Sequence, residues 1–156
     1  MGEEIFLNHV LNPRNVGLLD DANVVIQAGD LECDDKLIFF IRIEDDVLRD
    51  IQFLIEGCET TVAISSIVTE LVMGQPLDAV LNISAKSIAD ALNGLPVEKV
   101  HCSAMAASAM HAAVRQYRAT IKGEASSSIH NYEHYRIMAQ VLNQPLAQVY
   151  SSSYDL

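Results

Sequence analysis

The chain reads KLIFFIRIEDDVLRDIQFLI from Lys36 to Ile55, and this stretch decides the fold. Residues 36–43 are rich in β-branched and aromatic side chains, which favour a strand. Residues 44–46 are acidic and predict a tight turn. Residues 47–55 alternate at the two-residue period of a strand, with a predicted inner face made of Val47, Ile51, Phe53 and Ile55. The stretch therefore predicts two antiparallel strands joined by a turn.

The flanking sequence extends this hairpin into a small sheet with helices. Residues 24–28 (VVIQA) read as a preceding strand, and residues 3–11 as a short amphipathic helix that ends before Pro13. After Cys58 the apolar period becomes helical as far as Gly74. Two more helices are predicted: residues 84–92, capped by Ser84 and stopped by Asn93-Gly94, and residues 103–122. Strands followed by helices predict an α+β fold, with a small antiparallel three-stranded sheet packed against helices.

The last part of the chain differs from the rest. Residues 1–123 are predicted to form one domain, and residues 124–156 a C-terminal helical extension with a serine linker at residues 126–128. Apolar residues recur there at spacings of three or four, which is typical of a short helix: Ile129, Tyr132, Tyr135, Met138 and Leu142. We expect this extension to be ordered. Packing on its own domain, self-association into a homo-oligomer and docking of a partner all remain open.

Composition narrows the classes of partner. The formal net charge of −11 argues against nucleic acid and anionic membranes, because both attract basic patches. No stretch is apolar enough for a membrane span, and the first residues lack the features of a secretion signal. We therefore expect a cytoplasmic protein with reduced thiols.

Three cysteines, Cys33, Cys58 and Cys102, are the main chemical signal. An odd number argues against a closed disulfide framework. Cys33 lies in a predicted turn, whereas Cys58 and Cys102 lie where helices begin, and helix N-termini stabilise anionic sulfur. Their separations of 25 and 44 residues match no close-paired zinc motif, so the tertiary fold must assemble any site. From these residues alone, buried structural thiols and a metal or sulfur site are about equally good interpretations.

Four ordered motifs carry a family resemblance over residues 4–122. They are Asn12-Pro13-Arg14-Asn15-Val16-Gly17, then Cys33-Asp34-Asp35, then Gly57-Cys58 followed by a serine-containing helix with Thr69-Glu70, and finally Leu95-Pro96 through His101-Cys102-Ser103. In these motifs the chain resembles the iron–sulfur cluster assembly scaffolds of the IscU/NifU N-terminal family. The resemblance implies an IscU-like fold for residues 1–123.

The resemblance also implies a function and a set of site residues. Such scaffolds accept sulfur from a cysteine desulfurase, receive iron and electrons, build a [2Fe–2S] cluster and transfer it to apo-proteins. Carried over to this chain, Cys33, Cys58 and Cys102 are metal ligands and sulfur acceptors, and either Asp35 or His101 is the fourth ligand. The implied partners are the desulfurase, an iron donor, a ferredoxin-type reductant and apo acceptor proteins. No enzymatic turnover is implied.

The chain departs from the family pattern at several positions. Asp34 replaces a glycine, and Glu59-Thr60-Thr61 replaces Gly-Ser-Ala directly after Cys58. Residues 95–99 lack the second proline of the motif that Hsp70-type chaperones recognise, which argues against that partnership. The extension 124–156 contains no cysteine and has no counterpart in the pattern.

Two other functions compete with a cluster scaffold. The same ligands suit zinc, so the chain is alternatively a zinc-binding persulfide carrier that builds no cluster. An enzyme with a Cys102 nucleophile activated by His101 is a weaker hypothesis, because adjacent helical residues point about 100° apart.

Overall fold

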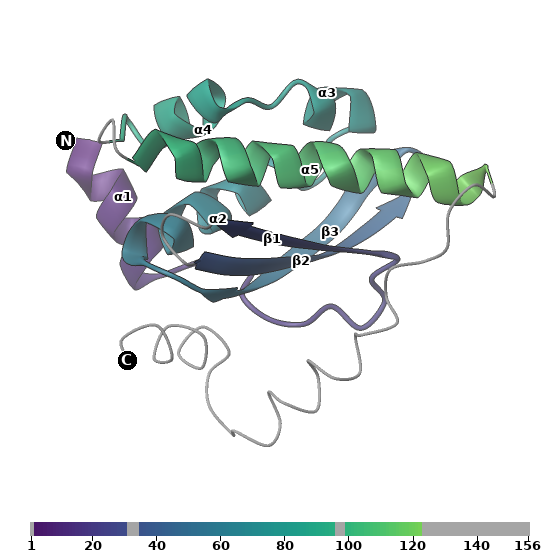
Figure 1. Cartoon of the computed structure of the whole chain (residues 1–156), viewed down its shortest axis with the longest axis horizontal. Coiled ribbons are helices and arrows are strands. Elements are labelled where there is room, and N and C mark those ends of the chain that lie inside the picture. The colour runs from purple at the N-terminus through teal and green to yellow at the C-terminus, as the bar shows by residue number, and fades with distance from the viewer. Residues whose placement is uncertain (1, 31–34, 96–98, 123–156) are drawn as a thin grey trace, which may run out of the picture.

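The computed structural model describes residues 2–30, 35–95 and 99–122 of the chain (Figure 1). The predicted helix of the C-terminal extension lies outside these ranges. The elements are, in chain order, α1 (Gly2–Leu11), β1 (Val24–Asp30), β2 (Asp35–Glu44), β3 (Val47–Glu56), α2 (Glu59–Val72), α3 (Leu77–Leu81), α4 (Ala85–Ala91) and α5 (Val100–Ile121).

The three strands form an antiparallel sheet in the order β1-β2-β3, which confirms the predicted meander. Asp45 and Asp46, between β2 and β3, both have positive φ, at 55° and 62°. Two consecutive positive φ angles are typical of a type I′ turn, whose twist matches that of the flanking strands. The Glu44–Asp46 turn was therefore correctly predicted.

One detail of the predicted β3 face is wrong. The pairing of β2 with β3 shifts between Arg42 and Ile43. Leu48, instead of Val47, consequently joins Ile51 and Phe53 in the core, and Leu48 is fully buried. A bulge of this kind interrupts strict alternation, which a two-residue period cannot anticipate.

Helices α2 and α5 cover one face of the sheet (Figure 1). The core between them includes Phe39 and Phe53, whose ring centroids lie 6.2 Å apart. Alternate residues of each strand point into this core, namely Val24, Ile26, Leu37, Phe39, Ile41, Ile51, Phe53 and Ile55. Helices α3 and α4 contact α5, and α1 contacts α2, so helices surround the covered face.

The opposite face of the sheet is also buried. Val16 bridges to Phe53 on the β3 edge, whereas Val24 opens β1 at the other edge, so residues 17–23 must cross the sheet. Leu18, Leu19 and Ala22 in this crossing pack on a second apolar cluster, which comprises Val25, Ile38, Phe40 and Leu54. The unbroken apolar run in β2 is explained because both of its faces are covered.

The helix boundaries agree with the sequence patterns except in two places. The Ser84 side chain accepts a hydrogen bond from Ser87 N–H in a capping box, as its position predicted. Helix α3 was not predicted, since its five residues are too few for a periodic pattern. Helix α5 begins at Val100, three residues before the predicted start. Among the described residues, no helix is both long and apolar enough to cross a membrane.

Candidate metal centre

The structure describes three of the five predicted ligands with their side chains: Cys58, His101 and Cys102. Cys33 lies outside the described residues. Asp35 is the first residue of β2, but its side chain is likewise outside the description. Within the described part of the chain, no three His, Cys, Asp or Glu residues form a metal-binding group. The complete ligand set therefore stays a prediction.

Cys58 is the N-cap residue of α2. Its backbone is extended, with φ −78° and ψ 169°, and its carbonyl accepts from Val62 N–H at 3.1 Å, which opens the helix. The thiol makes no capping hydrogen bond and is half-buried. Its sulfur lies 3.4 Å from Oγ1 of Thr61. A sulfur at this position meets the partial positive charge of the helix N-terminus.

Cys102 lies in the first turn of α5, third from its start. Its side chain is completely buried and belongs to the core between the sheet and the helices, whereas the side chain of His101 is half-buried. Because the two residues are adjacent on one helix, their side chains diverge by about 100°. This arrangement disfavours the Cys–His nucleophile, because the two side chains leave the helix in different directions.

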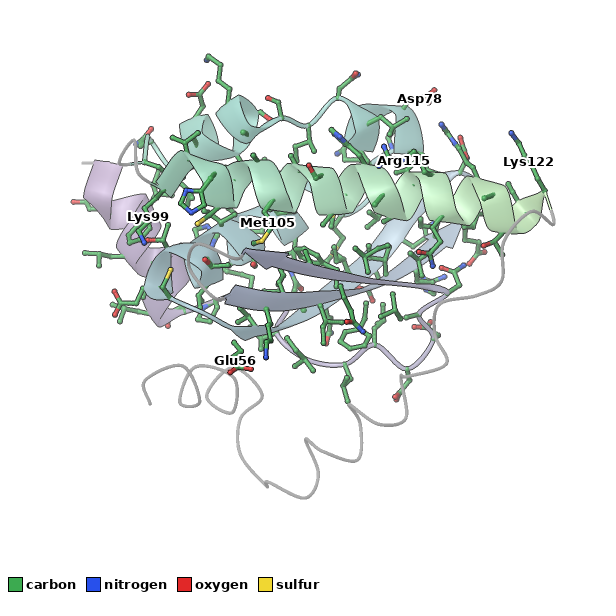
Figure 2. All side chains as sticks on the ribbon, in the orientation of Figure 1. Glu56, Asp78, Lys99, Met105, Arg115 and Lys122 are labelled. Atoms are coloured by element: carbon green, nitrogen blue, oxygen red, sulfur yellow. The ribbon has the colours of Figure 1, made fainter. Side chains whose placement is uncertain are left out.

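Strand register brings the ends of β1 and β2 that flank Cys33 in the sequence, and the end of β3 that precedes Cys58, to one end of the fold. Asp30 pairs with Asp35, so residues 31–34 connect two adjacent strand ends. Lys36 pairs with Glu56, so the chain that leaves β3 toward Cys58 starts beside the same strand end. Figure 1 shows α5 beginning at this end of the molecule. Figure 2 shows Glu56 and Lys99 toward this end and Lys122 toward the other.

A second polar cluster, which sequence reasoning did not predict, joins α1 to α2. His9 Nδ1 lies 2.6 Å from Ser66 Oγ, and His9 Nε2 lies 3.2 Å from Glu70 Oε1. A carboxylate can only accept, so Nε2 carries the proton and Ser66 donates to Nδ1. Ser66 Oγ in turn accepts from Arg14 N–H at 2.9 Å. The sequence pattern of residues 3–11 places His9 on the apolar side of α1, but this pattern does not identify the residues that His9 contacts.

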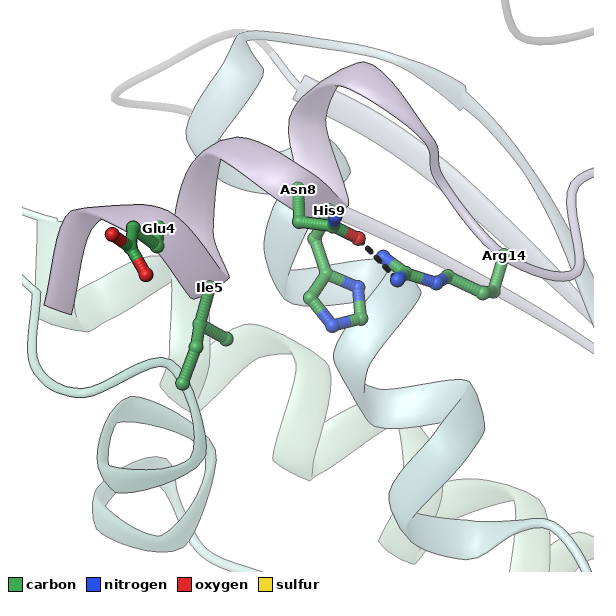
Figure 3. Close-up of a pocket in the computed structure, with 5 residues that line it drawn as sticks. All are labelled: Glu4, Ile5, Asn8, His9 and Arg14. Carbon is green, nitrogen blue, oxygen red and sulfur yellow. Dashed lines mark hydrogen bonds between the residues drawn. The ribbon is translucent and has the colours of Figure 1, made fainter. Parts of the chain in front are cut away.

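The surroundings of His9 keep it neutral. Burial lowers the pKa of His9 below its usual value, and the nearby Arg14 guanidinium lowers it further. Glu70 acts in the opposite direction and is outweighed. An open pocket of about 300 Å³ adjoins His9 and is lined by Glu4, Ile5, Asn8, His9 and Arg14. Figure 3 shows these residues, with the hydrogen bond that the Arg14 guanidinium donates to Asn8 Oδ1.

This cluster explains the first of the four sequence motifs. Beside the Arg14 bond to Ser66, Asn15 Nδ2 donates to Thr69 Oγ1 at 2.9 Å. Asn15 adopts a left-handed φ of 62°, and its carbonyl accepts from Phe53 N–H at 3.0 Å. The motif thus fastens the chain after α1 to both α2 and the edge of β3.

Comparison with known proteins gives the family. A sequence model of the NifU-like N-terminal domain matches residues 2–124. The iron-sulfur cluster assembly scaffold protein IscU of Aquifex aeolicus is 43% identical over 116 residues, covering 73% of this chain and 74% of that protein. IscU 1 of Archaeoglobus fulgidus is 39% identical over 110 residues, covering 70% of this chain and 72% of that protein. The nitrogen fixation protein NifU of Azotobacter chroococcum is 42% identical over 112 residues, which are 70% of this chain and 36% of NifU.

Solved structures confirm the fold. A SUF-system protein of Fervidobacterium islandicum (FiSufU) superposes with a TM-score of 0.62 at 16% identity, covering 71% of this chain and 94% of that one. The N-terminal part of a NifU-like protein from Brucella abortus gives 0.60 at 17% identity, covering 74% and 92%. The match of the family model over residues 2–124 and the 43% identity to the Aquifex aeolicus protein show that the chain belongs to the NifU-like N-terminal domain family.

Proposed function

We propose that this chain is a scaffold on which an iron–sulfur cluster is assembled and from which the cluster passes to other proteins. The observation that carries the proposal is the meeting of three segments at one end of the fold. These are the paired ends of β1 and β2 that flank Cys33 in the sequence, the N-cap residue Cys58 and the first turn of α5 with Cys102. Relatives with 39% and 43% identity are named iron-sulfur cluster assembly scaffold proteins.

The donor set suits iron and sulfide. Thiolates of Cys33, Cys58 and Cys102 are soft ligands, which favour iron–sulfur clusters and zinc over hard cations. A carboxylate of Asp35 or an imidazole of His101 would supply the fourth and weaker bond. One weak position suits a cluster that must leave its scaffold, and four ligands suffice for a [2Fe–2S] cluster.

Helix geometry supports the same chemistry. Cys58 and Cys102 occupy the starts of α2 and α5, where the first backbone N–H groups lack partners within the helix. Those groups and the helix dipole favour negative charge, whether on a thiolate or on a bridging sulfide. The cargo therefore meets a partly positive surface on a chain whose formal net charge is −11.

Sulfur would arrive by persulfide exchange. A scaffold thiolate attacks the terminal sulfur of a cysteine desulfurase persulfide; the S–S bond of the desulfurase breaks, and a persulfide forms on the scaffold. Two electrons from a ferredoxin-type reductant then break the new S–S bond and leave sulfide and thiolate. An iron donor supplies the metal, and apo-proteins receive the product. The chain acts as a stoichiometric carrier in this sequence and not as a turnover enzyme.

Zinc binding without cluster assembly is the competing proposal. The residue after Cys58 is Glu59 in place of the family's glycine, and bulk there would obstruct a cluster if it covered the sulfur. Glu59 is exposed in the first turn of α2, so it faces solvent. This favours the cluster. A cytoplasmic location stays a prediction from the expected reduced thiols.

Anaerobic purification followed by iron, zinc and acid-labile sulfide analysis tests the proposal. We expect visible sulfur-to-iron absorption and equal iron and sulfide after reconstitution with a cysteine desulfurase, cysteine, ferrous iron and a reduced ferredoxin. Cys33→Ala, Cys58→Ala and Cys102→Ala should each abolish the absorption. Ser108→Ala, on the exposed side of α5, should not. A colourless protein that holds one zinc and refuses a cluster would support the persulfide carrier instead.

A further inference from the structure

The hydroxyl of Thr61 lies against the sulfur of Cys58. Thr61 is the third residue of α2, and its Oγ1 is 3.4 Å from Cys58 Sγ, within hydrogen-bonding range for sulfur. The Thr61 side chain has no exposed surface, whereas Cys58 is half-buried. The contact therefore lies on the protein side of the thiol.

Whether the Cys58 sulfur carries a proton determines which group donates this hydrogen bond. A thiol and a hydroxyl can each donate, but a thiolate or a metal-bound sulfur has no proton. Once Cys58 acts as a ligand, only the Thr61 O–H can donate. A donor in a dry environment next to an anionic acceptor gives one of the stronger kinds of hydrogen bond.

This donor is a feature of this chain within the family pattern. Where the resemblance expects Gly-Ser-Ala after the cysteine, the chain has Glu59, Thr60 and Thr61. An alanine at the third position has no hydroxyl. The glutamate adds negative charge near the site, which makes the sulfur more electron-rich, whereas the threonine hydroxyl withdraws electron density from it. The two replacements act in opposite directions on the same atom.

We propose that Thr61 is a positioning residue for the metal ligand Cys58, and that its hydroxyl donates a hydrogen bond to the ligand sulfur. The bond fixes the sulfur at the start of α2 and weakens its donation of electrons to the metal. The inference rests on the proposed function, because it takes Cys58 as a ligand. It holds for a bound cluster and for a bound single metal ion alike.

Cobalt(II) added alone to the apo-protein tests the inference without cluster assembly. Thiolate-bound cobalt absorbs by transfer of a sulfur electron to the metal, and a hydrogen bond to the sulfur raises the energy of this transition. Thr61→Val keeps the shape and removes the hydroxyl, so its band should move to lower energy. Thr61→Ser keeps a hydroxyl and should restore the wild-type band. Thr60→Val is the matched control, because Thr60 lies about 100° around α2 from Thr61.

The outcomes separate this inference from the proposed function. A cobalt band in the wild type that does not move in Thr61→Val would overturn the role of Thr61 and leave the ligand set intact. No thiolate-to-cobalt band in the wild type would refute the ligand set, and the role of Thr61 with it. If Thr61→Val does not fold, Thr61→Ala gives the same comparison with the residue that the family pattern has there.

The cluster-loaded protein offers a second readout. Hydrogen bonds to cluster sulfurs raise the reduction potential. Thr61→Val should therefore shift the potential of the loaded protein to more negative values, whereas Thr61→Ser and Thr60→Val should leave it unchanged. A potential that is equal in all four proteins would contradict the hydrogen bond.

Discussion

Two serines with no exposed side-chain surface, Ser66 and Ser103, have opposite surroundings. The Ser66 hydroxyl joins His9 to the Arg14 backbone. The Ser103 hydroxyl, one residue after Cys102, is buried and has no hydrogen-bond partner among the described residues. A buried hydroxyl contributes stability only when its bonds are made, so the same truncation should have different effects at the two positions.

Ser66→Ala should lower the free energy of unfolding by about 1–3 kcal/mol, because it leaves buried donors and acceptors unpaired. Urea unfolding followed by circular dichroism measures this loss. His9 Nδ1 and Arg14 N–H are the groups that lose their partner. A loss below roughly 0.5 kcal/mol would mean that water or another side chain replaces the hydroxyl.

Ser103→Ala is expected to leave stability unchanged or to raise it by up to about 1 kcal/mol. The substitution removes an unsatisfied buried group, and alanine is the better helix former within α5. The same urea experiment compares it with Ser66→Ala. A marked loss of stability in Ser103→Ala would show that the hydroxyl has a partner in solution.

Sequence patterns identified which residues are candidates for the site, but they did not show which side chains contact one another. Cys58 and Cys102 were correctly expected at helix starts, because Gly57 and the apolar periodicity mark where α2 begins. The polar cluster around His9 was not predicted. Its members come from positions 57 residues apart, and no local pattern links a histidine on one helix to a serine on another.

At the scale of elements, the attachment of α1 to α2 depends on a neutral histidine. The pKa of His9 is lowered by burial and by Arg14 despite the opposing charge of Glu70. The unfolded chain therefore binds a proton at a higher pH than the folded one. The contribution of His9 is complete above about pH 6.5 and is lost as the pH falls below that value toward the lowered folded pKa.

Acidification from about pH 7.5 to about pH 5.5 should thus destabilise the wild type, at up to roughly 1.4 kcal/mol per pH unit from this group. His9→Gln does not titrate and should show a smaller pH dependence, although its stability at neutral pH is lower. Urea unfolding across this range measures both curves. Carboxyl groups contribute mainly nearer pH 4 and are common to both proteins. Parallel curves would contradict the role of His9.

The short helix α4 depends on its cap. Ser84→Ala removes the side chain that accepts from Ser87 N–H at 3.1 Å and should lower the free energy of unfolding by about 1 kcal/mol. The fully buried side chain of Ile88 still holds α4 in place, so the helix itself should remain in Ser84→Ala. Ser108→Ala, at an exposed position of α5, is the control and should be neutral or slightly stabilising in thermal or urea unfolding. Equal effects of the two substitutions would contradict the cap.

Helices and strands were predicted well where an apolar pattern continues over many residues, and less well where a β-bulge interrupts the pattern. Strand β2 and helix α2 were located within two residues because each carries a continuous apolar pattern. The inner face of β3 was partly wrong because the shift after Arg42 moves Leu48 inward. Such a shift depends on the partner strand and is invisible in the sequence of β3 alone.

For the whole molecule, the strand count and the helical covering were predictable, but the second buried face was not. The crossing segment 17–23 covers Phe40 and Leu54 through contacts with Leu19, and these residues are distant in sequence. The site shows the same limit. Sequence motifs supplied all five candidate ligands, but they could not show that the register of Lys36 with Glu56 places the start of β2 beside the end of β3, from which the chain continues to Cys58.

The extension provides the last test, because the family match ends at residue 124 and every proposed ligand precedes Gly123. A chain that ends at Gly123 should give the same cobalt(II) spectrum as the full chain. It should also unfold at a lower temperature, since the apolar residues between Ile129 and Leu142 have the spacing of a helix that packs on a surface.

A chain that ends at Tyr150, which lacks only residues 151–156, is the control and should match the full chain. Size-exclusion chromatography of all three chains shows whether the extension contributes to self-association. If stability and oligomeric state are both unchanged without residues 124–156, the extension has no structural role. If the cobalt spectrum changes, the extension reaches the metal site.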